Sequence, residues 1–158
     1  MQIQKVEAIA KDYLVSEVEL VYKNRVPYAS RPEIKSSKDS YQLFLHYWDA
    51  NKIDLQEQFK VLFLNRSNHA LAIAEISCGG ITGTVVDIRL ILSTALKLHA
   101  TVLTLCHNHP SGNLSPSIQD EKITEQIKTA AALLDIRLLD HLILSSDGYY
   151  SFADEGKI

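Results

Sequence analysis

Short apolar runs separated by polar turns follow one another from residue 59 onward. Five of them predict strands, because they are rich in β-branched and aromatic residues and are bounded by turn-forming residues: FKVLFL (59–64), ALAIAEI (70–76), ATVLTLC (100–106), IRLLDHLILS (136–145) and GYYSFAD (148–154). The first two runs flank Asn65-Arg66-Ser67-Asn68 and predict a hairpin. The last two flank Ser146-Asp147-Gly148, which predicts a second turn.

Apolar residues at helical spacing predict three helices among these strands. The first spans about 36–50 and is capped by Ser37 or Asp39, the second is capped by Thr84, and the third begins near Ile118. Their buried stripes are expected to be Tyr41, Leu45 and Trp48; Ile88, Ile91, Leu92 and Ala95; and Ile123, Ile127, Ala130, Ala131 and Leu134. Because strands alternate with helices, the chain is expected to form an α/β layered domain with a mixed sheet.

The first 36 residues have a different pattern. A helical pattern near residues 6–14 and a strand-like run at 17–26 come before two prolines, which interrupt regular structure. Five basic residues and one acidic residue lie between Lys23 and Lys38, a stretch that suits either a polyanion or ordinary solvent. We therefore divide the chain into an N-terminal extension, 1–36, and a domain, 37–158.

Composition excludes several classes of protein. With 46% hydrophobic and 22% charged residues among 158, the chain can bury one core without cross-links and is not a disordered protein. No apolar run approaches a membrane span, and no export signal is evident, so a cytoplasmic protein without a membrane partner is expected. Cys78 and Cys106 are accordingly expected to be reduced core thiols. The net charge of −3 disfavours nucleic acid as the main ligand, although a local patch would suffice.

Two histidines and an aspartate form the most informative pattern. His107 and His109 are two residues apart at a strand end, so their side chains point to the same side. Asp120 follows eleven residues later, in the first turn of a helix that Ser117 is expected to cap. Two imidazoles and a carboxylate suit Zn²⁺, and three protein ligands leave the fourth position for water, as in a catalytic site.

The whole segment HNHPSGNLSPSIQD (107–120) resembles the motif of the JAMM (MPN-plus) metallopeptidases, in which His-x-His-Pro precedes Ser-x-x-Asp and a glutamate lies well upstream. Together with EQFKVLFLNRSN (57–68), LLDHLIL (138–144) and GYYSFADEG (148–156), it is similar to the bacterial RadC family over roughly residues 38–156. This resemblance implies a JAB/MPN-like (cytidine-deaminase-like) fold, in which helices flank a mixed β-sheet.

The resemblance also implies roles for five residues. His107, His109 and Asp120 match the ligands of one zinc ion per chain. Ser117 matches the serine that helps to hold the oxyanion of the tetrahedral intermediate. Glu57 matches the glutamate that acts as general acid and base on the zinc-bound water.

Two assignments near this site depend on further residues. Glu75, on the predicted partner strand, competes with Glu57 for the role of general base. His141, between Asp140 and an apolar run, is expected to be a buried, hydrogen-bonded histidine, with support of a zinc ligand as the alternative. Asn108 lies on the opposite side of its strand and is expected to fix the loop.

Three functions remain open at this stage. The first is a zinc-dependent hydrolase of an amide, peptide or isopeptide bond, whose protein or peptide substrate is unknown. The second is a nucleic-acid-associated accessory factor in DNA repair or recombination. The usual helix-hairpin-helix region of the family is not expected in residues 1–36, and this weakens the second function. The third is a metal-stabilised interaction module without turnover. An exposed sheet edge would also allow a homo-oligomer.

Overall fold

A five-stranded mixed sheet forms the centre of the computed structural model, which describes residues 15–16, 18–19, 26–79 and 85–158. The strands are β1 (Gln58–Leu64), β2 (Ala70–Cys78), β3 (Val102–Asn108), β4 (Arg137–Ser145) and β5 (Gly148–Ser151), in the order β2-β1-β3-β4-β5. Only the β3–β4 pair is parallel, and the other pairs in this sheet are antiparallel. The predicted α/β fold with a mixed sheet is therefore confirmed.

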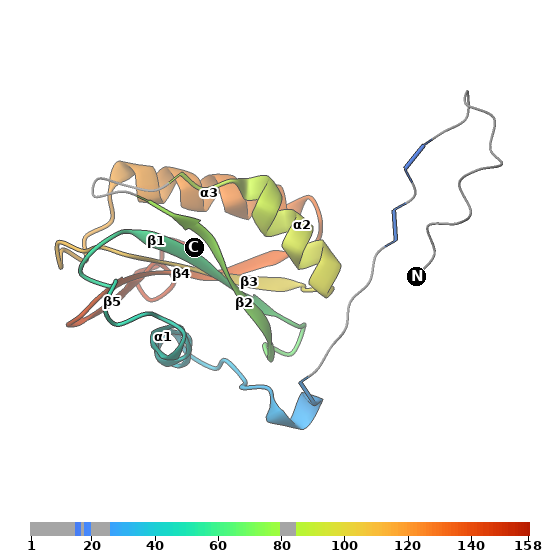
Figure 1. Cartoon of the computed structure of the whole chain (residues 1–158), viewed down its shortest axis with the longest axis horizontal. Helices are drawn as coiled ribbons and strands as arrows, with labels where there is room; N and C mark the ends of the chain where they lie inside the picture. Colours follow the sequence, from blue (N-terminus) through green and yellow to red (C-terminus); the bar gives the residue numbers. More distant parts are fainter. Residues whose placement is uncertain (1–14, 17, 20–25, 80–84) are drawn as a thin grey trace.

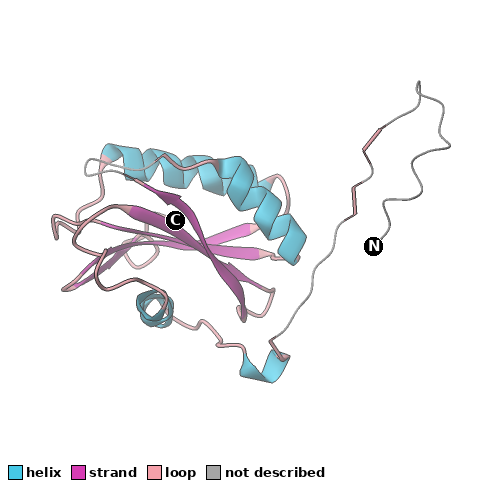
Figure 2. Ribbon diagram, viewed as in Figure 1, coloured by secondary structure: helices cyan, strands magenta, loops and turns pink. Residues whose placement is uncertain are grey.

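Helices cover both faces of the sheet (Figures 1 and 2). Helices α2 (Ile88–Leu98) and α3 (Ile118–Ala132) lie over one face, and α1 (Ser37–His46) lies under the other. A short 3-10 helix, η2 (Tyr28–Ser30), precedes α1. Two separate apolar clusters fill the layers, one beneath α2 and α3 and one beside α1. No helix in the described part of the chain is long and apolar enough to span a membrane.

Both central strands are buried on both faces, as their apolar sequences predict. All seven residues of β1 and all seven of β3 are buried, and alternate side chains pack into the two clusters. The central strand β3 pairs antiparallel with β1 and parallel with β4. The C-terminal end of β3, which carries the histidine pattern, is therefore held from both sides.

Helix caps differ from the sequence-based expectations. Ser36, rather than Ser37 or Asp39, caps α1, because its side chain accepts from the Asp39 N–H at 3.2 Å. Asp87 caps α2 because that helix begins at Ile88, whereas Thr84 lies outside the described residues.

Three residues that the sequence predicts to be buried are exposed. In α1, Phe44 is fully buried against the sheet, and Leu45 beside it is 36% exposed. Leu134 lies beyond the end of α3 and is exposed, so it does not extend that helix's buried stripe. Cys106 is a core thiol, but Cys78 is exposed, because it ends the edge strand β2.

The N-terminal predictions are only partly covered by the structure. The expected helix at 6–14 and most of the expected strand at 17–26 fall outside the described residues. Ile34 packs in the cluster beside α1, and Glu33 forms an isolated antiparallel bridge with His69. The division of the chain at residues 36 and 37 stays a prediction.

Asn108, at the end of β3, ties the segment before β1 to the sheet. Its side-chain oxygen accepts from the Gln58 N–H at 2.7 Å, and its amide donates to the carbonyls of Ile53 and Gln56 at 2.6 and 2.9 Å. Asn108 does lie on the opposite side of the strand from the histidines, but the segment it fixes is 53–58 rather than the loop after His109. This segment contains Glu57.

Replacing Asn108 should be costly. Asn108→Ala leaves one buried N–H and two carbonyls without their partner, so we expect a loss of about 2–4 kcal/mol in the free energy of unfolding. The matched control is Asn51→Ala, at an exposed turn, which should change it by less than about 0.5 kcal/mol. Urea unfolding of both variants measures the difference, and equal midpoints would contradict this role for Asn108.

Candidate metal centre

The end of β3 and the first turn of α3 bring three metal-ligating side chains together. His107 is buried within β3, His109 follows directly after it, and Asp120 is the third residue of α3. One potential ligand atom from each lies within 4.8 Å of the others. Among the described residues this is the only such group of three or more histidines, cysteines and acidic residues.

Hydrogen bonding fixes the proton of His109. Its Nδ1 lies 2.5 Å from the carbonyl oxygen of Asn113. A carbonyl only accepts, so Nδ1 carries the proton and donates it. In the neutral ring, Nε2 is then left with a free lone pair directed at His107 and Asp120.

The three side chains approach one another at the spacing of tetrahedral zinc ligands. The two Nε2 atoms are 3.0 Å apart, His107 Nε2 is 3.1 Å from Asp120 Oδ1, and His109 Nε2 is 3.6 Å from Asp120 Oδ2. Tetrahedral coordination at about 2.0–2.1 Å places two ligand atoms about 3.3 Å apart. The residues present therefore fit a zinc ion, both in donor chemistry and in spacing.

Ser117 and Asp120 form a reciprocal cap at the start of α3. The Ser117 hydroxyl oxygen accepts from the Asp120 N–H at 3.1 Å, and Asp120 Oδ2 accepts from the Ser117 N–H at 2.7 Å. Burial opposes the ionisation of Asp120, but the neighbouring His107 and His109 hold its pKa well below the usual range. The carboxylate is thus ionised and fixed in orientation.

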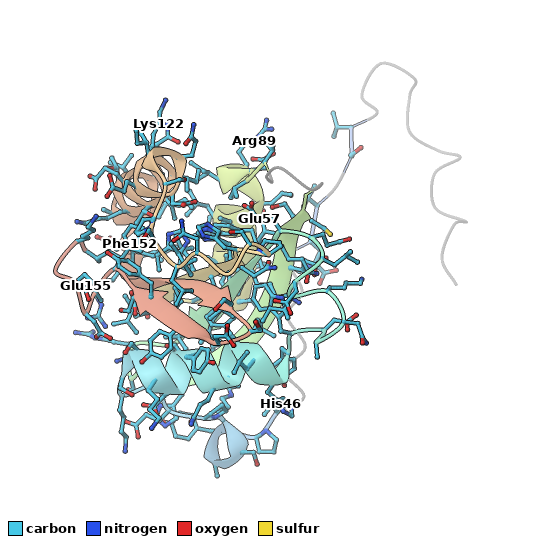
Figure 3. All side chains as sticks on the ribbon, turned by 90° about the vertical axis from the view of Figure 1, so that its left-hand side faces the viewer. His46, Glu57, Arg89, Lys122, Phe152 and Glu155 are labelled. Carbon is cyan, nitrogen blue, oxygen red and sulfur yellow. The ribbon has the colours of Figure 1, made fainter. Side chains whose placement is uncertain are left out.

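Glu57 lies beside this group, and Glu75 does not. Figure 3 shows Glu57 between the sheet and the layer formed by α2 and α3. Burial raises the pKa of its carboxyl, while His107 and His109 act in the opposite direction. Glu75, on β2, instead pairs with Lys60 at 3.3 Å and accepts from Gln58 Nε2 at 2.6 Å.

An open cleft of about 750 Å³ surrounds the candidate ligands. Glu57, His107, His109, Ser117 and Asp120 all line it. Its walls come from the side of α3 that carries Gln119, Ile123 and Gln126 and from the segment 85–86 before α2, with Phe59 in the wall next to His107. The cleft has room for a ligand larger than water beside the metal position.

A second layer of side chains stands behind His107. His141 is fully buried, and its Nε2 lies 2.9 Å from His107 Nδ1. Its other nitrogen lies 2.6 Å from the hydroxyl of Thr124. The prediction of a buried, hydrogen-bonded His141 is confirmed, and its partner is a candidate ligand.

Sequence reasoning missed Thr124 and Asn113. Thr124 lies four residues after Asp120, one turn further along the same face of α3, so helical spacing alone indicates that the two are neighbours. Asn113 acts through its backbone carbonyl, so its residue type gives no signal.

Comparison with known proteins identifies relatives of this chain. Residues 34–157 match the family of RadC-like JAB domains. A UPF0758 protein of Flavobacterium johnsoniae is 56% identical over 100 residues, which cover 63% of this chain and 44% of that protein. A UPF0758 protein of Porphyromonas gingivalis is 41% identical over 133 residues, covering 84% and 59%.

A third UPF0758 protein, from Histophilus somni, is 35% identical over 158 residues, covering 100% of this chain and 65% of that protein. The chain thus spans between 44% and 65% of the length of these three curated relatives. The similarity therefore concerns one part of each relative.

The ligand assignment predicts stoichiometric zinc. Protein purified without a His-tag should contain about one zinc ion per chain, and His109→Ala or Asp120→Ala should weaken zinc binding more than about 100-fold, because loss of a ligand exceeds loss of a supporting residue. His46→Ala, on α1 away from the cleft, is the matched control and should keep the metal. Elemental analysis measures the content. Absence of zinc after reconstitution of the parent protein would contradict the site.

Proposed function

Because this chain belongs to the family of RadC-like JAB domains, we propose that it is a zinc-dependent hydrolase that cleaves an amide bond of a peptide or isopeptide. JAB domains are often metallohydrolases. The observation that carries the proposal is the presence of three convergent ligand atoms, the half-buried carboxyl of Glu57 and the hydroxyl of Ser117 in one cleft. His107, His109 and Asp120 would hold the zinc ion. A zinc ion with three protein ligands supplies a Lewis acid and lowers the pKa of water toward neutrality.

Glu57 suits the role of general base and acid. Its carboxyl is desolvated, and the raised pKa increases its affinity for a proton. It can therefore accept a proton from the attacking water and return it to the leaving amine, the two transfers that amide hydrolysis requires. Asn108 holds the adjacent backbone and so positions this carboxyl relative to the histidines.

Ser117 suits the role of oxyanion donor. Its oxygen already accepts the Asp120 N–H, so the hydroxyl proton is available to a substrate oxygen. Both residues lie at the N-terminus of α3, where the helix dipole favours negative charge. Charge that develops on the carbonyl oxygen of the substrate would be stabilised there.

The proposed role of Glu57 is tested by substitution, with Glu75 as the control position. Glu57→Gln should retain zinc and lower kcat about 10²–10⁴-fold, since it removes the proton acceptor. Glu75→Gln, which replaces a carboxylate outside the cleft, should keep both. Turnover is measured by mass spectrometry on a panel of peptides and lysine isopeptide conjugates with zinc-loaded protein. If the parent cleaves none of them, the hydrolase proposal fails. If Glu57→Gln loses zinc or keeps activity, its assigned role is wrong.

The role of Ser117 requires a control for helix capping. Ser117→Ala should lower kcat about 10²–10³-fold, as loss of one oxyanion donor does. It also removes an N-cap, which costs about 1 kcal/mol of stability. Ser36→Ala removes the equivalent cap of α1 and should cost similar stability without changing kcat. Equal kcat values for the two variants would refute the catalytic role of Ser117.

Association with nucleic acid stays a prediction. Of the basic residues between 23 and 38, Lys35 pairs with Glu33 at 3.0 Å, and Lys23 and Arg25 lie outside the described residues. A salt-dependent shift of DNA by the full chain, together with absence of peptide cleavage, would favour this function instead.

A further inference from the structure

A chain of hydrogen bonds runs from His107 back to the helix that carries Asp120. His107 Nδ1 lies 2.9 Å from His141 Nε2, and His141 Nδ1 lies 2.6 Å from Thr124 Oγ1. Thr124 Oγ1 lies 2.5 Å from the backbone carbonyl oxygen of Asp120. Its last member is an atom that can only accept.

This terminal carbonyl determines where the proton of Thr124 lies. A hydroxyl has one proton, and the short contact with the Asp120 carbonyl is attractive only if that proton lies between the two oxygens. Thr124 therefore donates to Asp120 and must accept from His141. The proton of His141 is then on Nδ1.

The surroundings of His141 leave its ring with that single proton. The ring is fully buried, stacks on Phe152 at a centroid distance of 4.9 Å, and lies edge-on to Phe59 at 5.6 Å. A second proton would place a positive charge among these aromatic rings and out of contact with water, so the ring stays neutral. A neutral ring with its proton on Nδ1 has a bare Nε2, which can only accept from His107.

We propose that Thr124 and His141 are positioning residues that hold His107 in the Nδ1–H tautomer, so that its Nε2 lone pair faces His109 and Asp120 before any metal binds. The alternative tautomer would place a proton at Nε2, where the ion must bind. His109 reaches the same state through the Asn113 carbonyl, so both imidazoles are prepared for the ligand role. This preparation deepens the proposed function, since it rests on the same metal centre, but it does not depend on turnover.

The Asp120 carboxylate opposes this arrangement in the metal-free protein. Its Oδ1 lies 3.1 Å from His107 Nε2, and the bare Nε2 of His109 lies 3.0 Å from the same nitrogen, so both would attract a proton to it. The hydrogen bonds that link His107 through His141 to Thr124 must outweigh this attraction. The tautomer of His107 therefore reports directly whether the hydrogen bond to His141 is stronger than the contacts with Asp120 and His109.

The test is to determine the tautomer of His107 in metal-free protein. Long-range ¹H–¹⁵N NMR at alkaline pH, where histidine is neutral, distinguishes a protonated from a bare ring nitrogen. Substitution of each of the six histidines in turn assigns the signals. We expect a protonated Nδ1 and a bare Nε2 at His107 in the unsubstituted chain. A protonated Nε2 would overturn the proposal without any variant having to fold.

Variants of Thr124 provide a second test of the proposal. Thr124→Val removes the acceptor of the His141 proton and should convert His107 to a mixture of tautomers, whereas Thr124→Ser should restore the single form. The control is Thr104→Val, since the hydroxyl of Thr104 is buried with no hydrogen-bond partner among the described residues. An unchanged His107 signal in folded Thr124→Val would also overturn the proposal.

Zinc affinity gives an independent measure. Competition with a chromophoric chelator should show about 10–100-fold weaker binding for Thr124→Val, the range for loss of a residue that supports a ligand, and no change for Thr104→Val. Equal affinities for these two variants would count against the proposal. If the tautomer and the affinities are as expected and no substrate is cleaved, the hydrolase proposal fails alone. If cleavage occurs and His107 carries its proton on Nε2, this inference fails alone.

Discussion

The crowding of acceptor atoms at the end of β3 is the constraint on which the rest of the structure depends. Two imidazole nitrogens and a carboxylate lie within 3.0–3.6 Å of one another in a largely buried position. Such groups repel one another unless a proton or a cation lies between them, and the low dielectric of the interior strengthens that repulsion. The side chains must therefore be held by rigid elements. A fully buried strand and a reciprocally capped helix turn supply them.

The alternating direction of side chains along β3 links this centre to the carboxyl of Glu57, the proposed general base. The side chain of His107 faces the layer of α2 and α3, where its ring stacks on Phe59 at a centroid distance of 6.1 Å. The next residue, Asn108, faces the other side and holds the segment 53–58 by hydrogen bonds. Two successive residues of β3 thus have different roles: His107 is a candidate ligand, and Asn108 fixes the segment that carries Glu57. Glu57 and His107 are far apart in the sequence and are brought together by the β1–β3 pairing, in which Phe59 lies opposite His107.

Much of this arrangement was predictable from the sequence, because strands and ligands follow local patterns. The buried runs of β1 and β3 and the His-x-His spacing need no tertiary information. Other features depend on tertiary contacts that no local pattern encodes. The partners of the Asn108 side chain lie 50 to 55 residues away, and the proton of His109 is fixed by a backbone carbonyl, which every residue type carries. The caps of α1 and α2 lie one to three residues from the predicted positions, because each segment offers several neighbouring residues of a capping type.

The two histidines depend on different parts of the fold. His109 is oriented by the loop that follows it, through Asn113, whereas His107 is oriented by β4 and α3, through His141 and Thr124. Helix α3 contacts the centre twice, since the side chain of Asp120 faces the histidines and its carbonyl accepts from Thr124. Displacement of α3 from the sheet would move Asp120 and would break the hydrogen bond from His141 to Thr124 that supports His107. Metal binding and the packing of α3 are therefore coupled, and an ion bound here would stabilise the docked helix by the free energy of its own binding.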